Sequence, residues 1–200
     1  MIIEYRKGSV PLAIKIFIDQ GHNPSGFFNS GAEANGLNES EINYQVGIYL
    51  RNMLNNDPRY EARVSRPTPT TVLGTDNTTS LAERVRMANE WPANYFISIH
   101  CNSNPNPAIN GTEVYILQYF TEANWFAEQV LNGIIETVGT KNNGIRINKS
   151  LYVLRRTTMT AILVELGYLT NLSDAEKLRD NQYLFALGIF RGINKYFGFA

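Results

Sequence analysis

The strongest constraint on the fold is a regular alternation of two kinds of segment along the 200-residue chain. Short apolar or alternating segments, typical of strands, occupy residues 14–19, 60–65, 95–100, 112–117, 151–154 and 161–166. Longer segments with the apolar spacing of helices occupy residues 39–54, 80–90, 121–138 and 181–196. Strands that alternate with helices predict an α/β domain with a largely parallel sheet.

The composition fits one folded domain. Hydrophobic residues make up 44% of the chain and charged residues 18%, which is enough apolar material for a core and too little charge for a disordered chain. We expect a single domain over residues 1–200, with its core at about 14–198 and an N-terminal extension, residues 1–11, of unclear role. Basic and acidic residues number 18 each, and this zero net charge argues against a nucleic-acid binder.

No segment has the length and apolar character of a membrane span. The longest uncharged apolar stretch near the start, residues 10–14, is too short for the apolar region of a signal peptide. We therefore expect no membrane insertion and no signal peptide within this chain.

Four polar side chains lie where a parallel sheet usually carries its site. His22 follows the first strand, His100 ends the strand YFISIH, and Glu165 lies near the end of the apolar strand AILVEL. Glu41 lies in the first turn of the helix that follows a long polar loop. Two imidazoles and one carboxylate are a usual ligand set for catalytic zinc, and a further carboxylate could transfer protons. These residue types at these positions would therefore suit a hydrolytic zinc site.

Each of these residues also has a purely structural explanation. A histidine at a strand end is often a hydrogen-bonded surface residue, and Glu41 fits a capping box that begins at Asn38. Glu165 is harder to explain in this way, because a carboxylate in a buried strand is costly unless it is paired, protonated or bound to a metal. Similar capping boxes are predicted at residues 80–83 and 173–176.

Cys101 is the only cysteine and follows His100 directly. Adjacent residues on a strand point to opposite faces, so a Cys–His catalytic pair cannot easily form there. We interpret Cys101 as a small buried residue. A single cysteine also excludes an internal disulfide.

The segments that carry these residues resemble those of one known family. IFIDQGHN, NESEINYQVGIYLRNML, YFISIHCNSNPNP and AILVELGYLTN are similar, in this order, to motifs of the zinc-dependent N-acetylmuramoyl-L-alanine amidases of the amidase-3 type. These are catalytic domains of bacterial and phage cell-wall hydrolases. SLAERVRMAN resembles a further helix of the family, and the resemblance covers residues 15–197. Tyr168, Thr160 and Cys101 stand where the family more often has Phe, Pro and Ala.

This resemblance implies a ligand set and a mechanism. It assigns one Zn²⁺ per chain to His22, Glu41 and His100, with Glu39 as a rival that fits the family's Glu-x-Asn register less well. Glu165 then takes a proton from the zinc-activated water and gives it to the leaving L-alanine amine. The bond cut would join the N-acetylmuramoyl lactyl group of peptidoglycan to L-alanine.

The resemblance also implies a three-layer α/β fold, with a twisted, mostly parallel mixed sheet flanked by helices, like that of zinc exopeptidases. Substrate contacts are expected from Asn102, which follows His100, and from Arg155 or Arg156, which precede the Glu165 strand. A solvated pair explains the two arginines equally well. The enzyme would act on the bacterial cell wall, either secreted as an autolysin or released from a phage-infected cell as an endolysin.

Three other functions remain open on the sequence. A zinc carboxypeptidase would begin its ligand set with H-x-x-E, but Asn23-Pro24-Ser25 follows His22. A peptidoglycan-binding module without activity would have lost a ligand or the catalytic glutamate, and none is lost here. A metal-free cysteine hydrolase would need Cys101 as its nucleophile.

Overall fold

The computed structural model describes residues 12–199, so the expected N-terminal extension, residues 1–11, lies outside the described residues. Its centre is a six-stranded sheet in the order β4-β1-β5-β8-β6-β7. The strands are β1 (Ile14–Gln20), β4 (Tyr60–Val64), β5 (Tyr95–Asn102), β6 (Thr112–Ile116), β7 (Asn142–Ile147) and β8 (Thr160–Tyr168). A separate small hairpin is formed by β2 (Glu33–Ala34) and β3 (Leu37–Asn38).

The sheet is mixed but mostly parallel. β4, β1, β5 and β8 run in one direction, and β6 pairs antiparallel with β8. β7 then pairs parallel with β6. This confirms the predicted fold class. The strand β7 was not predicted, because its residues are mostly polar or small and lack a clear apolar alternation.

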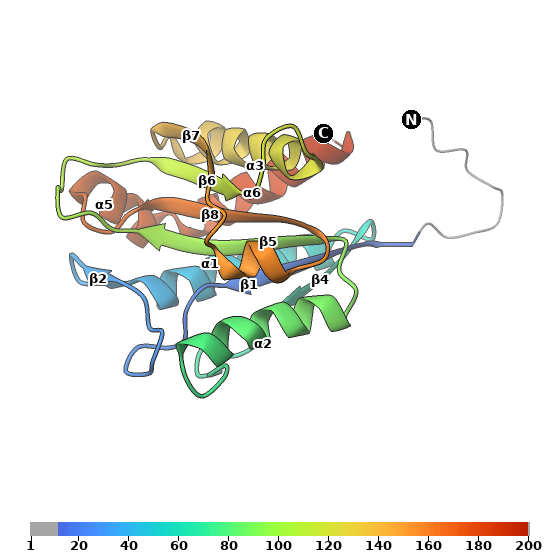
Figure 1. The fold of residues 1–200 in the computed structure, drawn as a ribbon. Coiled ribbons are helices and arrows are strands. Elements are labelled where there is room, and N and C mark those ends of the chain that lie inside the picture. Colours follow the sequence, from blue (N-terminus) through green and yellow to red (C-terminus); the bar gives the residue numbers. More distant parts are fainter. Residues whose placement is uncertain (1–11, 200) are drawn as a thin grey trace.

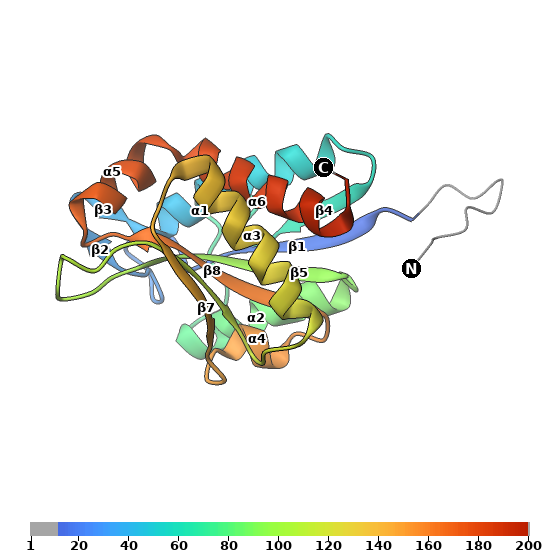
Figure 2. The same ribbon diagram turned by 90° about the horizontal axis from the view of Figure 1, so that it is seen from above.

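Helices cover both faces of the sheet and make three layers (Figures 1 and 2). α1 (Glu39–Asn55), α3 (Glu122–Val138) and α6 (Gln182–Phe197) lie on one face, with α5 (Leu172–Asp180) beside one end. α2 (Asn77–Glu90) and the short α4 (Tyr152–Arg156) lie on the other. Alternation along β1 shows the reason, since Ile16 and Ile18 enter the core under α1 and α6 while Phe17 enters the core under α2.

Three local predictions were wrong. Residues 151–154, predicted as a strand, begin the helix α4, because this segment packs on α2 and closes a helical bond from Arg155 N to Leu151 O instead of joining the sheet. α2 begins earlier than predicted, since Asp76 and Thr79 form its capping box. α5 is capped by Asn171, whose side chain accepts from Asp174 N, and not by residue 173.

No helix among the described residues has the length and apolar character needed to cross a membrane.

The close contact between α3 and α6 depends on glycines. Gly133 on α3 faces Gly188 and Gly192 on α6, and a Cβ atom at Gly133 would overlap the carbonyl oxygen of Gly188. Backbone has no rotamer with which to escape such an overlap, so the two helices would have to separate. Small residues at this crossing therefore set the distance between the helices.

We predict that Gly133→Ala lowers the free energy of unfolding by about 1–3 kcal/mol, because overpacking forces backbone shifts. Glu128→Ala, at an exposed position of the same helix, is the matched control and should change it by less than about 0.5 kcal/mol. Denaturant unfolding of both variants measures the difference. Equal stabilities of the two variants would contradict the proposed packing constraint.

Candidate active site

Two histidines and one glutamate converge at the carboxyl end of the parallel strands. His22 lies in the loop after β1, Glu39 is the first residue of α1, and His100 lies near the end of β5. One carboxylate oxygen, Oε1 of Glu39, lies 3.0 Å from His22 Nε2 and 3.0 Å from His100 Nδ1. One donor atom from each of the three residues lies within 4.8 Å of the other two. Such a cluster could hold a metal ion.

The acidic member of this cluster is Glu39, and the expectation that Glu41 lies there was wrong. Glu41 is exposed and lines a different pocket, beside Tyr44 and Arg66. Residues two apart on a helix point about 200° away from each other, so Glu39 and Glu41 cannot both face the histidines. Asn38 caps α1 as predicted. Its side chain accepts from the Ser40 backbone N–H, and not from Glu41 as the predicted capping box requires.

Glu39 is held as a buried anion. Its Oε1 accepts from Cys101 N at 3.1 Å, and its Oε2 accepts from Ala32 N at 2.9 Å. Burial by itself raises the pKa of Glu39, but the hydrogen bonds and charges of His100 and His22 outweigh it and hold that pKa well below its usual range. The carboxylate is therefore ionised and ready to bind a cation at neutral pH.

The loop after β1 fixes the orientation of His22. The His22 backbone has a φ of 71°, an uncommon left-handed conformation for a residue other than glycine. Its Nδ1 lies 3.1 Å from Asn29 Oδ1 and 3.2 Å from the Asn29 carbonyl, two acceptors to which Nδ1 donates, while Nε2 faces Glu39 and is the ring nitrogen that a metal ion could bind. A Cβ atom at Gly31 would lie 2.8 Å from both Glu39 Oε2 and the His22 ring, so only glycine lets the loop close here.

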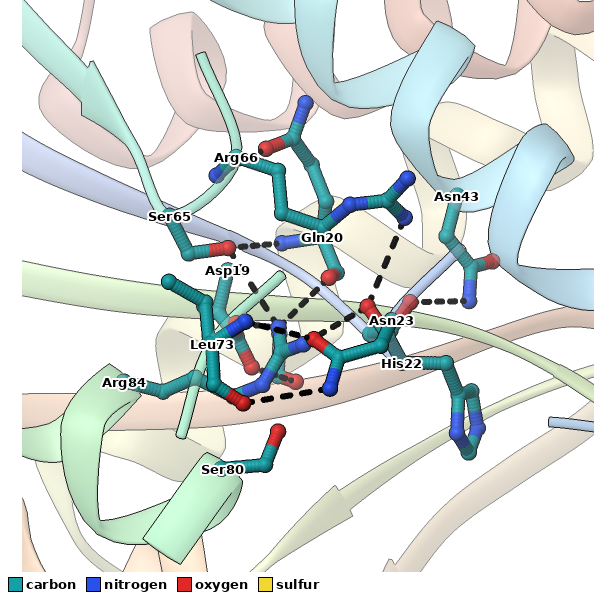
Figure 3. A network of polar contacts seen from close by, with 12 residues as sticks. Asp19, Gln20, His22, Asn23, Asn43, Ser65, Arg66, Leu73, Ser80 and Arg84 are labelled. Atoms are coloured by element: carbon teal, nitrogen blue, oxygen red, sulfur yellow. Dashed lines mark hydrogen bonds and ion pairs between the residues drawn. The ribbon is translucent and has the colours of Figure 1, made fainter. Parts of the chain in front are cut away.

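The strained loop is held from behind by a buried arginine on α2 (Figure 3). Arg84 Nη1 donates to Asp19 Oδ1 and to the Gln20 carbonyl, each at 2.6 Å. Its Nη2 donates to the His22 carbonyl at 2.6 Å. Asp19 and Arg84 are both 1% exposed, and although burial opposes ionisation, the charge of Arg84 keeps the pKa of Asp19 below its usual value.

Further buried polar side chains complete this support (Figure 3). Arg66, two residues after the end of β4, donates from Nη1 to the Ser40 carbonyl at 2.9 Å and to the His22 carbonyl at 3.4 Å, which links the first turn of α1 to the His22 loop. Asn23 exchanges hydrogen bonds with the backbone of Leu73 at 3.0 and 3.1 Å. The loop that presents His22 is thus bonded to α1, α2 and the segment that precedes α2.

Glu165 lies on β8 directly beside His100, since the two are register partners in the parallel β5–β8 pair. Side chains of register partners share a face, so its carboxyl group lies on the same side of the sheet as the His100 ring. Its Oε2 is buried and has no hydrogen-bond partner among the described residues. Burial first, then the charges of Glu39 and Glu113, raise the pKa of Glu165 well above its usual value.

Both the sequence and the fold of this chain are similar to those of known proteins. Residues 16–195 match the family model described as N-acetylmuramoyl-L-alanine amidase. The chain belongs to the N-acetylmuramoyl-L-alanine amidase family. It is therefore an amide hydrolase of the kind that degrades peptidoglycan, as the resemblance predicted.

Individual relatives agree with this assignment. The amidase CwlM of Bacillus licheniformis is 34% identical, over 94% of this chain and 70% of CwlM. LytC of Bacillus subtilis is 35% identical, but the match covers 84% of this chain and only 32% of LytC. The crystal structure of an N-acetylmuramoyl-L-alanine amidase from Clostridium difficile 630 is 30% identical and superposes with a TM-score of 0.81, covering 93% of this chain and 97% of that one.

The pocket of the amidase lies between the two histidines and α4. It has a volume of about 240 Å³, and His22, His100, Asn29 and Tyr152 are among its lining residues. The structure does not bring the predicted Arg155 and Arg156 into it, because both are exposed on α4 with their guanidinium groups 6.0 Å from the centre of the Tyr152 ring.

The other two residues singled out from the sequence are already bonded within the amidase. Asn102 Nδ2 donates to Glu113 Oε1 at 2.9 Å, so its amide is held beside the Glu165 strand. Cys101 is 3% exposed and lies 3.5 Å from Asn43 Oδ1, and burial raises the pKa of its thiol well above the usual value. A buried neutral thiol is a poor nucleophile, which argues against a cysteine hydrolase.

We predict that Arg84→Met lowers the free energy of unfolding by about 3–5 kcal/mol, because it leaves the buried charge of Asp19 unpaired. A double variant that also carries Asp19→Leu should recover part of this loss. Denaturant unfolding measures both, with Arg86→Met as the control, since Arg86 is an exposed arginine of the same helix. A loss in Arg84→Met no larger than that in Arg86→Met would show that the buried pair does not support the loop.

Proposed function

We propose that this amidase hydrolyses the amide bond between the N-acetylmuramoyl lactyl group and L-alanine of peptidoglycan, with zinc held by His22, Glu39 and His100. One observation carries the proposal: two imidazoles and an ionised carboxylate converge within 4.8 Å, beside Glu165, whose buried Oε2 has no hydrogen-bond partner among the described residues. The relatives named as cell-wall amidases, and an endolysin of Bacillus phage SPP1 at 29% identity, support action on the bacterial cell wall.

The donor set fits zinc. Imidazole nitrogens and a carboxylate oxygen bind Zn²⁺ at about 2.0–2.2 Å, so neighbouring ligand atoms of one ion lie roughly 3–3.5 Å apart. The separations of 3.0 Å from Glu39 Oε1 to each histidine nitrogen agree with this geometry. The contact of His22 Nδ1 with Asn29 supplies the supporting hydrogen bond that ligand histidines usually make. When bound, zinc would supply a Lewis acid that acidifies a water and stabilises negative charge on the attacked carbonyl oxygen.

Glu165 is assigned the proton transfers. Its carboxyl group lies on the His100 side of the sheet, and Oε2 makes no hydrogen bond that would occupy it. As a carboxylate, Glu165 can accept a proton from the attacking water, and as the resulting acid it can give that proton to the leaving amine of L-alanine. Protonation of that amine is required, because an amide anion is a very poor leaving group.

Glu39→Gln and Glu41→Gln form a matched pair that tests the ligand set. We expect Glu39→Gln to lose at least about tenfold in zinc affinity, since it removes a charged ligand from the cluster. Glu41→Gln should retain one zinc per chain, because Glu41 is exposed and lies outside the cluster. Elemental analysis after dialysis, and competition with a chromogenic chelator, measure this. Zinc loss confined to Glu41→Gln would overturn the assignment.

We expect Glu165→Gln to bind zinc normally and to cleave peptidoglycan about 10²–10⁴-fold more slowly, because glutamine cannot carry the proton. The assay follows new L-alanine amino termini and new reducing sugar ends from purified cell walls. The wild type should release amino termini without reducing ends, and chelation of its zinc should stop this release. Undiminished cleavage by Glu165→Gln would exclude the proposed role.

A further inference from the structure

Glu113 is, after Glu39, a second buried glutamate beside the site, and no sequence pattern indicated it. It is 1% exposed and lies on β6, where it is the register partner of Glu165 in the antiparallel β6–β8 pair. The register places His100, Glu165 and Glu113 side by side on three adjacent strands, with their side chains on one face. The polar floor of the site therefore extends away from the metal cluster toward β7.

Both oxygens of Glu113 are occupied by donors. Oε1 accepts from Asn102 Nδ2 at 2.9 Å, from the Tyr115 hydroxyl at 2.9 Å and from the Tyr168 hydroxyl at 3.2 Å. Oε2 accepts from Arg146 Nε at 2.5 Å. Because four donors occupy its two oxygens, the Glu113 carboxylate positions neighbouring side chains and does not itself react.

Arg146, which donates to Glu113, still has unused hydrogen-bond donors on its guanidinium group. It lies on β7 as the register partner of Tyr115, so its side chain shares the face that holds Glu113 and Glu165. Its side chain is 50% exposed and, among the described residues, Nε to Glu113 is its only hydrogen bond. Four of the five guanidinium N–H donors thus stay available, and the bond to a buried carboxylate fixes the plane of the group.

We propose that Arg146, positioned by Glu113, binds a carboxylate of the stem peptide on the side of Glu165 that faces away from the metal cluster. This inference rests on the proposed function, because it takes the bond beside Glu165 as the one cleaved. The ligand class is a peptide carboxylate that follows the L-alanine residue.

Distance and chemistry both favour this ligand. Adjacent strands lie about 4.8 Å apart, and the Arg146 side chain leans back over β6 to reach Glu113, so its guanidinium lies roughly 5–8 Å from the Glu165 carboxyl group. Two extended residues span about 7 Å, which places the carboxylate of the second stem residue at this position when the L-alanine amide lies at Glu165. An arginine with both Nη groups available binds such a carboxylate in two parallel hydrogen bonds, which a carboxamide cannot match.

Two synthetic substrates test the proposal. Both are N-acetylmuramoyl tripeptides with an amidated C-terminus, and they differ only in whether the second stem residue carries an α-carboxylate or an α-carboxamide. We expect the wild type to prefer the carboxylate by about tenfold in kcat/KM. Arg146→Gln should remove the preference by raising KM for the carboxylate substrate alone, and Arg146→Lys should restore part of it. Arg191→Gln, at an exposed arginine on α6, is the control and should behave as the wild type.

Binding separates this inference from the proposed function. Calorimetry with the Glu165→Gln protein measures the affinity of each tripeptide without cleavage, with and without Arg146→Gln. If neither tripeptide is cleaved by the wild type but the carboxylate is bound through Arg146, the proposed reaction fails and the anion site stands. The anion site is overturned if Arg146→Gln lowers the affinity for both tripeptides equally. It is also overturned if the wild type shows no preference for the carboxylate tripeptide. Both outcomes count against it whichever reaction is catalysed.

Discussion

The buried pair of Arg84 and Asp19 is the interaction on which the site depends. Asp19 lies next to the end of β1, and the same guanidinium also binds the carbonyl oxygens of Gln20, the last residue of β1, and of His22 in the loop that follows. The 2.6 Å bond from Arg84 Nη2 to the His22 carbonyl is the shortest that this left-handed backbone makes, and it helps to offset a strain of about 1–3 kcal/mol. Arg84, on α2, therefore orients His22, the proposed metal ligand in the loop after β1.

Three neighbouring glutamates in this enzyme, Glu39, Glu113 and Glu165, have different surroundings, and these differences suggest different roles. Glu39 is ionised because two histidines and two backbone N–H groups face it. Glu113 is bonded to an arginine and to three side-chain donors. Burial, and then the charges of these two anions, raise the pKa of Glu165, whose buried Oε2 has no hydrogen-bond partner among the described residues. The negative charges of Glu39 and Glu113 are balanced by their hydrogen-bond donors, and Glu165 is left as the glutamate suited to transfer protons.

Much of this arrangement could be predicted from residue patterns. The apolar segments around Ile16, Ile97 and Val164 gave the parallel core of the sheet, because buried parallel strands are apolar on both faces. The positions of His22, His100 and Glu165 at or near the ends of these strands follow from the same pattern. β7 and α4 could not be predicted in this way. The first is a polar edge strand, and the second is a short segment whose packing against α2 decided its conformation.

The sequence by itself determined the fold class, the family and three of the four residues in the proposed site, because strand ends and family motifs are local features. The tertiary structure alone decided between Glu39 and Glu41. Both lie in the first turn of α1, and only the rotation of that helix against β5 turns one toward the histidines and the other to solvent. It also decided the place of Arg146, because register across three strands joins residues that no spacing along the chain connects.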